Sequence, residues 1–306
     1  MGAKNIKWPP RLVEDIARRQ AVIYLGSGIS ASSENKDKKR PPTWESFLKK
    51  IVEERGEDLD DNPDNSNRKE VKRVINRLIK EKNYLMACEV ILDKLGDKKF
   101  RELADDEFRI PGFKHNRLHE LIRILDSRIV LTPNVDSIYE DYSRDSGGVI
   151  VKSYADKDLA KYLRPRLEEY LVIKVHGSAS GAEPLVFTQS QYSKSRNEHM
   201  NFYKILDALL LTRTFVFLGC GITDPDIQLA LENMNFSFPD CRAHYMVIPS
   251  KGISKTELKC LSKNRNLEFL EYDNSDGVHS CLLSSLEELI KEVEEKRKDL
   301  VVTATW

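Results

Sequence analysis

Short apolar runs alternate with longer amphipathic stretches along the chain, most regularly after residue 126. Several runs lack strict alternation of apolar and polar residues, as strands buried on both faces of a sheet do. The stretches between them repeat apolar residues at three- and four-residue spacing, which is typical of helices. Strands and helices that alternate in this way predict a parallel sheet with right-handed crossovers. The predicted fold class is α/β, a Rossmann-like doubly wound parallel sheet with an all-helical insertion as a second, small helical module.

The predicted elements follow from these patterns. Strands are expected at residues 21–25, 128–132, 149–153, 171–175, 214–218, 243–248 and 267–270. Helices are expected at residues 44–52, 71–79, 84–95, 118–125, 202–211, 225–234, 255–263 and 282–296, and one more is expected to begin at Val135.

The region from residue 44 to residue 125 carries helical signals and no strand candidate. The acidic stretch 56–67 within it, and the polar stretch 32–40 before it, predict loops. We therefore expect a single domain over residues 1–306. Its Rossmann-like core should cover about 11–43 and 126–298, and its helical module about 44–125.

Charge and cysteine content exclude several classes of function. The 49 basic residues balance the 49 acidic ones, so there is no basic footprint for nucleic acid and direct nucleic-acid binding is not expected. The five cysteines are odd in number and lack C-x-x-C spacing, which argues against a disulfide framework and a zinc ribbon. The apolar runs are too short to span a membrane, and the amino terminus lacks the apolar core of a signal peptide. We expect a soluble cytoplasmic protein that does not bind membranes.

Two of the six histidines, His115 and His119, stand one helical turn apart, as two metal ligands would. The sequence between them lacks the glutamate of a zinc protease motif. The pattern predicts an ordinary helix surface, and no metal site is expected in the chain.

A glycine loop, Gly26–Ser30, follows the first predicted strand. In a strand–loop–helix unit, backbone N–H groups of such a loop can face a pyrophosphate. The same Gly-x-Gly spacing also occurs in ordinary tight turns between a strand and a helix. Because this loop sits on the first strand of the alternating pattern, it predicts a dinucleotide site.

A second motif, Thr132-Pro133-Asn134-Val135-Asp136, lies at the end of another predicted strand, where open α/β sheets hold their ligands. One interpretation is structural, with Thr132 or Asn134 capping the following helix. The other is functional, with the Asn134 amide holding a ribose hydroxyl or a water and Asp136 orienting it.

Two further strand ends carry candidate chemistry. His176 follows the strand at 171–175 and precedes Gly177, and an imidazole there can take a proton from a ribose hydroxyl or from water. The segment 217–226 is a second strand–glycine–helix junction, in which Asp224 and Pro225 fit a helix start. Its glycines can also approach a ribose or a phosphate.

Together these motifs resemble the sirtuin family, in its divergent zinc-less branch of bacterial sirtuin-like proteins. Gly26–Ser30 is similar to the family's Gly-Ala-Gly-Ile-Ser cofactor loop, Thr132–Asp136 to its Thr-Gln-Asn-Ile-Asp motif, and Val175–Gly177 to its catalytic His-Gly. Residues 219–223 resemble its later Gly-Thr-Ser segment, and Ile248 would lie near the adenine ribose. The resemblance implies the following cofactor-binding residues: Gly26, Ser27, Gly28, Ile29, Ser30, Thr132, Gly219, Gly221, Thr223 and Ile248.

The chain departs from sirtuin deacylases in two respects. It has no four-cysteine zinc module, and Pro41-Pro42-Thr43-Trp44 is the nearest segment to the family's Pro-Asp-Phe-Arg. These departures disfavour peptide deacylation and leave the NAD pocket complete.

The resemblance therefore implies an NAD⁺ glycohydrolase that cleaves NAD⁺ to nicotinamide and ADP-ribose without a metal. In this hypothesis Asn134 positions water or the ribose hydroxyls, His176 is the general base, and Asp136 supports Asn134. The family branch is associated with anti-phage defence by NAD⁺ depletion, which implies a homo-oligomer and a separate partner subunit such as a HerA-type ATPase. The alternatives are an NAD-dependent protein deacylase or ADP-ribosyltransferase, and a non-catalytic module that senses NAD or ADP-ribose.

Overall fold

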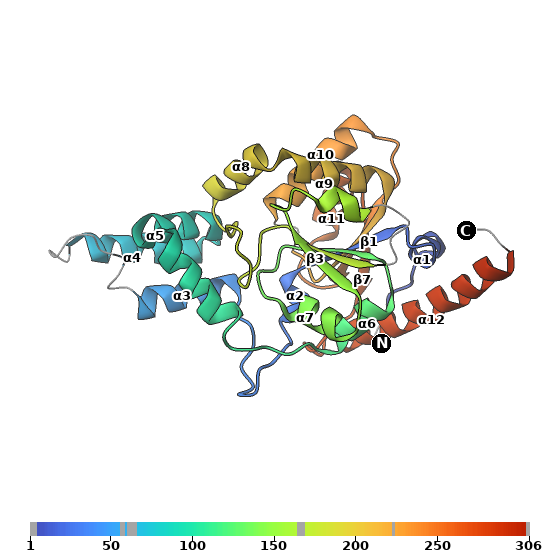
Figure 1. Ribbon diagram of the computed structural model, residues 1–306, viewed down its shortest axis with the longest axis horizontal. Helices are drawn as coiled ribbons and strands as arrows, with labels where there is room; N and C mark the ends of the chain where they lie inside the picture. The colour runs from blue at the N-terminus through green and yellow to red at the C-terminus, as the bar shows by residue number, and fades with distance from the viewer. Residues whose placement is uncertain (1–4, 56–58, 60–65, 164–168, 222–223, 304–306) are drawn as a thin grey trace.

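The computed structural model describes residues 5–55, 59, 66–163, 169–221 and 224–303 (Figure 1). Its centre is a seven-stranded parallel sheet in the order β3-β4-β2-β1-β5-β6-β7. The strands are β1 (Ala21–Leu25), β2 (Ile129–Thr132), β3 (Val149–Ser153), β4 (Tyr170–Lys174), β5 (Thr214–Leu218), β6 (His244–Pro249) and β7 (Leu267–Tyr272). All seven predicted strands are present, which confirms the α/β fold class.

The helices enclose the sheet and form the module beside it. They are α1 (Pro10–Ala17), α2 (Ser27–Ser30), α3 (Trp44–Glu54), α4 (Ser66–Lys80), α5 (Tyr84–Phe108), α6 (Arg117–Ile124), α7 (Ile138–Asp145), α8 (Gln189–Glu198), α9 (Met200–Thr212), α10 (Pro225–Ser237), α11 (Lys255–Arg265) and α12 (Ser280–Thr303), with a 3₁₀ turn η1 (Leu159–Leu163). Four of these elements, α1, α2, η1 and α8, were not predicted from the sequence. Helix α8 was missed because it is polar and buries only Tyr192 and Ser195, so it has no apolar periodicity.

The predicted start of the helix that follows β2 is wrong. Helix α7 begins at Ile138, three residues after the expected Val135, and the segment before it is a loop. The Asp136 side chain accepts a hydrogen bond from the Ile138 amide at 3.1 Å. Neither Thr132 nor Asn134 caps this helix, since its N-cap residue is Ser137.

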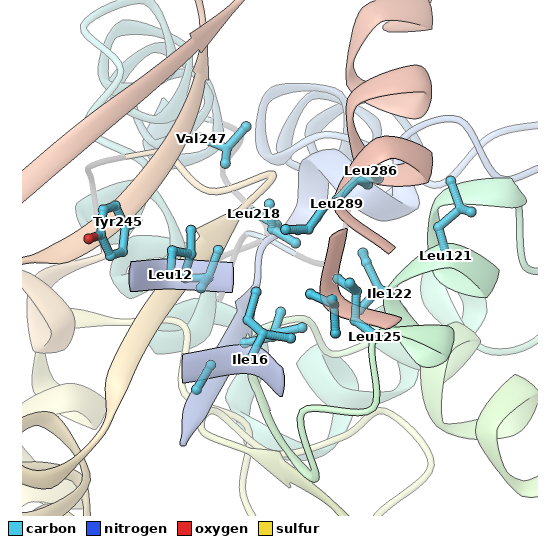
Figure 2. Close-up of a cluster of buried hydrophobic side chains, with 14 of the residues drawn as sticks. Leu12, Ile16, Leu121, Ile122, Leu125, Leu218, Tyr245, Val247, Leu286 and Leu289 are labelled. Carbon is cyan, nitrogen blue, oxygen red and sulfur yellow. The ribbon is translucent and has the colours of Figure 1, made fainter. Parts of the chain in front are cut away.

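Helices cover both faces of the sheet because successive strand side chains point to opposite sides. Ile23 of β1 belongs to the cluster with α1, α6 and α12, whereas Tyr24 belongs to the cluster with α9 and α10. Figure 1 shows α8–α11 above the sheet and α6, α7 and α12 below it. Figure 2 shows the lower cluster, in which Ile16, Leu125 and Leu289 lie together although they come from three separate segments.

Helices α3, α4 and α5 form the module to the left of the sheet in Figure 1, with a hydrophobic core of their own. Phe47, Ile75 and Ile91 are fully buried there. Helix α6 packs instead in the cluster with α12. The expected module boundary near residue 125 stays a prediction, and most of the expected loop at 56–67 lies outside the described residues.

The order of the strands determines where a ligand site can lie. The chain leaves β1 toward β2 on one side, and β5 pairs with the other side of β1. A crevice opens beyond the carboxyl ends of the strands where the order of an open α/β sheet reverses, and ligands bind in that crevice. Here the reversal lies between β1 and β5, so both glycine loops lie at its rim.

Candidate functional site

A cavity of about 830 Å³ lies beyond the carboxyl ends of β1, β2, β4 and β5. The sheet side contributes Gly26, Asn134, His176 and Gly221 to its lining, and the helical module contributes residues such as Trp44. Its volume is within the range of cofactor sites, about 300–1,000 Å³.

The two glycine loops pack backbone against backbone at the rim of this cavity. The Gly28 amide donates a hydrogen bond to the Gly219 carbonyl at 2.9 Å. A Cβ atom at Gly26 would lie 2.4 Å from the Gly219 oxygen, and a Cβ at Gly219, where φ is +63°, would lie 2.6 Å from the Ile29 nitrogen. Glycine is needed at these positions for the loops to approach each other.

Part of the first loop is already hydrogen-bonded within the protein. The amides of Gly26, Gly28 and Ile29 all donate to backbone carbonyls of the chain. Ser27, which is exposed, and Ser30 both line the cavity. A pyrophosphate at this loop would therefore meet polar groups of Ser27 rather than those three amides.

Asn134 and Asp136 are linked through a third residue. The Ser30 hydroxyl lies 3.4 Å from the Asn134 Nδ2 atom and 3.4 Å from the Asp136 Oδ1 atom, so it can accept from the amide and donate to the carboxylate. Thr132 ties the same loop to β1, because its hydroxyl donates to the Leu25 carbonyl at 2.8 Å and accepts from the backbone N–H of Asn134 at 3.1 Å. The Asn134 side chain is thus held in place from below while facing the cavity.

A buried ion pair lies under this loop. Lys174 Nζ is 2.5 Å from Glu140 Oε1 and donates to the Asp136 carbonyl at 2.5 Å. Burial raises the pKa of the Asp136 carboxyl, and the nearby Lys174 ammonium opposes that rise. The loop that carries Asn134 therefore depends on a lysine inside the core.

His176 is paired with Asp224. Its Nε2 atom is 2.8 Å from Asp224 Oδ2 and 3.2 Å from the Tyr192 hydroxyl, and the imidazole is 5% exposed. Its Nδ1 atom is buried and has no hydrogen-bond partner among the described residues. The Tyr24 hydroxyl also approaches Asp224 Oδ2, at 3.4 Å.

The pairing moves both pKa values. Burial by itself lowers the pKa of His176, but the charge and hydrogen bond of Asp224, with smaller contributions from the Asp226 charge and the Val175 backbone, raise that pKa above its ordinary value. Burial by itself raises the pKa of Asp224, and the His176 charge together with hydrogen bonds from two backbone amides lowers it overall. The pair therefore favours the charged forms of both groups.

Aromatic residues form the opposite wall of the cavity. The Trp44 ring is nearly parallel to the Tyr84 ring, with centroids 6.4 Å apart, and meets the Phe187 ring edge-on at 5.1 Å. Pro41 and Pro42 continue this wall. The helical-module side of the cavity is therefore largely aromatic, although Glu45, Lys82 and Asn83 also line it.

The structure brings most of the predicted site residues together. The predicted residues that line the cavity are Gly26, Ser27, Gly28, Ser30, Asn134, Asp136, His176 and Gly221. Thr132, Gly219, Ile29 and Ile248 do not line it; the first two hold the loops, and Ile29 and Ile248 are buried in the core. Thr223 lies outside the described residues.

Several residues of the site were not predicted from the sequence. Asp224 was expected only as a helix cap, and the aromatic wall was not expected. Tyr192 stands on the missed helix α8, whose start is marked by a capping box between Thr188 and Gln191. That Thr-x-x-Gln spacing was the available signal.

The expected surface position of His119 is wrong. His119 is 1% exposed, and its Nδ1 atom accepts from the Asn116 amide in a capping box at the start of α6. Burial lowers its pKa to about 3. Among the described residues, no group of three or more His, Cys, Asp or Glu side chains is arranged to hold a metal ion.

None of the helices in the described part of the chain combines the length and the apolar character needed to cross a membrane.

Comparison with known proteins gives a consistent set of relatives. Residues 128–270 match the model of the SIR2-like domain. The chain is 23% identical over 262 residues to the NAD(+) hydrolase ThsA of Cytobacillus dafuensis. The aligned residues make up 85% of this chain and 47% of the relative. It is 24% identical over 248 residues to the NAD(+) hydrolase ThsA of Bacillus cereus (strain MSX-D12), covering 80% of this chain and 46% of the relative.

A further relative is the defense-associated sirtuin 2 of Bacillus subtilis, 22% identical over 223 residues, covering 72% of this chain and 20% of the relative. The chain spans less than half the length of these curated relatives.

Proposed function

Because this chain belongs to the sirtuin-like family, we propose that it is an NAD⁺ glycohydrolase that releases nicotinamide and ADP-ribose. The observation that carries the proposal is the single cavity in which Asn134, His176 and the first glycine loop meet. Relatives named NAD(+) hydrolase support NAD⁺ as the substrate.

The geometry supports a direct displacement by water. Cleavage of the N-glycosidic bond develops oxocarbenium character on the ribose, and the bonding electrons leave with neutral nicotinamide. Asn134, held by Ser30, positions the water or the ribose hydroxyls, and His176 accepts the proton. Fixing substrate and water in one orientation supplies a large part of the barrier reduction.

Asp136 supports this arrangement indirectly. It contacts Ser30 rather than Asn134, so its role is to orient the hydroxyl that holds the amide. Three of the predicted residues would contribute by holding the shape of the loops, namely Thr132, Gly219 and Ile29. Contacts of Thr223 and Ile248 with the adenosine half of NAD⁺ stay predictions.

We place this activity in bacterial anti-phage defence, where NAD⁺ depletion by an activated effector stops the infected cell. The relative named as a defense-associated sirtuin supports this assignment. The homo-oligomer, the HerA-type ATPase partner and the cytoplasmic location also stay predictions.

Chromatographic quantification of nicotinamide and ADP-ribose after incubation with NAD⁺ tests the proposal. Wild type and His115→Ala, whose histidine lies outside the cavity, should release both products in equal amounts. His176→Ala should lose the release by about 10²-fold or more. Release that survives in a folded His176→Ala would remove His176 from the chemistry, and tight NAD⁺ binding without turnover, with partner added, would favour a sensor module.

A further inference from the structure

The two carboxylate oxygens of Asp224 make separate contacts. Oδ1 accepts hydrogen bonds from the amides of Asp226 and Ile227, at 3.0 and 3.1 Å, and so caps α10. Oδ2 faces His176 Nε2 at 2.8 Å. Serine, threonine or asparagine can cap a helix with one oxygen, so capping alone needs neither the second oxygen nor the charge.

The contact determines which nitrogen of His176 carries the proton. A carboxylate only accepts hydrogen bonds, so Nε2 must be the protonated nitrogen that donates to Asp224. In the neutral ring the lone pair is then on Nδ1, which has no partner within the described residues. The partner of one ring nitrogen fixes the role of the other.

We propose that Asp224 is a positioning residue for NAD⁺ cleavage, which holds His176 in the tautomer whose Nδ1 accepts the proton and stabilises the resulting imidazolium. The inference rests on the proposed function. Asp224 stays ionised throughout and does not contact the reacting atoms, as in other carboxylate–histidine pairs of hydrolases.

The proton balance is complete with water as co-reactant. Water gives its oxygen to the anomeric carbon and a proton to Nδ1, and the glycosidic electron pair leaves with nicotinamide. The imidazolium then releases its proton to solvent, which restores the neutral ring. Because Nδ1 is buried, the ring or its loop must shift when substrate enters so that the attacking water reaches this nitrogen.

The titratable groups nearest to the pair are neutral at physiological pH. Tyr192 contacts His176 and Tyr24 contacts Asp224, and burial raises the pKa of both phenols. Burial also raises the pKa of the Cys220 thiol, which lies near Asp224. The one ionised side chain in hydrogen-bond contact with His176 among the described residues is therefore Asp224.

Asp226 lies farther away and has its own partners. Its carboxylate accepts from Arg196 at 2.5 Å and from the Tyr203 hydroxyl at 2.7 Å. Its charge also raises the pKa of His176, but less than Asp224 does. Without the Asp224 carboxylate, the lowering effect of burial on the pKa of His176 should exceed the raising effect of Asp226, so this pKa should fall.

Two substitutions distinguish the capping of α10 by Asp224 from its pairing with His176. Asp224→Asn and Asp224→Ser both keep an oxygen that can cap α10, and both remove the charge that faces His176. Ser254→Ala is the matched control, because Ser254 caps α11 outside the cavity. Because Ser254→Ala removes a cap outright, its melting temperature should fall at least as far as those of the two Asp224 variants.

We expect both Asp224 variants to lower kcat for NAD⁺ cleavage by about 10²-fold or more, with KM little changed. The acid limb of the kcat profile should also move to lower pH, since a less basic His176 loses its proton earlier. Ser254→Ala should retain the wild-type kcat and profile. Wild-type kcat and an unchanged pH profile in Asp224→Asn would overturn the proposal, as would faster cleavage.

A measurement that does not depend on turnover separates this inference from the proposed function. NMR titration of ¹⁵N-labelled histidine, with the His176 signals identified by their loss in His176→Ala, reports the tautomer and pKa directly. Protonated Nε2 and a pKa that falls in Asp224→Asn support the hold of Asp224 on the His176 tautomer even if no NAD⁺ is cleaved, in which case the proposed function fails and the pairing stands. Protonated Nδ1, or a pKa that does not change, overturns it.

Discussion

Gly28 and Gly219 join the two glycine loops through one backbone hydrogen bond, from the amide of the first to the carbonyl of the second at 2.9 Å. This contact brings together two segments that the chain separates by the whole helical module and four strands. It holds the rim of the cavity at the point where the strand order reverses.

Gly219→Ala should destabilise the protein because its Cβ would lie 2.6 Å from the Ile29 nitrogen. Gly148→Ala is the matched control, since its φ of +61° is similar and its Cβ would meet nothing within 4 Å. We expect Gly219→Ala to lose about 1–3 kcal/mol more than the control in urea unfolding. Equal losses would show that the loops can separate at no cost.

Ser30→Ala should lower kcat for NAD⁺ cleavage by about tenfold, which corresponds to about 1.4 kcal/mol, because it removes the hydroxyl between Asn134 and Asp136. Ser30→Ala should have no further effect once Asn134→Ala is present, since the hydroxyl acts through that amide. Kinetics of the double-mutant cycle measure this coupling. Additive losses would mean that Ser30 contacts the substrate independently.

Lys174→Met should destabilise the protein by about 3–5 kcal/mol in urea unfolding, because it leaves Glu140 buried without its partner. The double variant Lys174→Met/Glu140→Leu should recover most of that loss. As a control, Lys152→Met breaks the more exposed pair with Asp158 and should cost about 1 kcal/mol or less. A small effect of Lys174→Met alone would contradict a strong buried pair.

His119 should make the protein less stable in acid. Its folded pKa is about 3, below the unfolded value of about 6.5, so the unfolded chain binds the extra proton between these values and stability falls as the pH drops through them. His119→Gln keeps the capping box with Asn116 and cannot titrate. Unfolding free energies from pH 7 to pH 4 should therefore fall less in His119→Gln than in wild type. Parallel curves would rule out His119 as a source of the acid sensitivity.

Much of the fold could be predicted because strand and helix signals are local. The β-branched and apolar runs identified all seven strands to within about two residues at each end. The polar helix α8 was not predicted because it is held in the fold by tertiary contacts of Tyr192 and has no apolar periodicity. Helix α7 starts three residues later than expected because the Asp136 side chain accepts a hydrogen bond from the Ile138 backbone amide, and the preceding residues form a loop.

Many residues of the candidate site could be predicted, but the contacts between their side chains could not. Asn134, Asp136, His176 and Gly26 were expected at strand ends and do line one cavity. Asp136 was expected to support Asn134, whereas the Ser30 hydroxyl lies between the two side chains. Such distances depend on how separate loops pack, which no local pattern records.

Local patterns are enough to predict the parallel α/β architecture and the residue types at the strand ends, because hydrophobic periodicity and the demand for glycine act over a few neighbouring residues. Which of these strand ends meet depends on the tertiary packing. His176 pairs with a residue 48 positions away, and Ser30 with one 106 positions away, because the strand order places β1 between β2 and β5. Contacts of that range follow from burying one sheet between two helical layers, a condition that the whole chain satisfies at once.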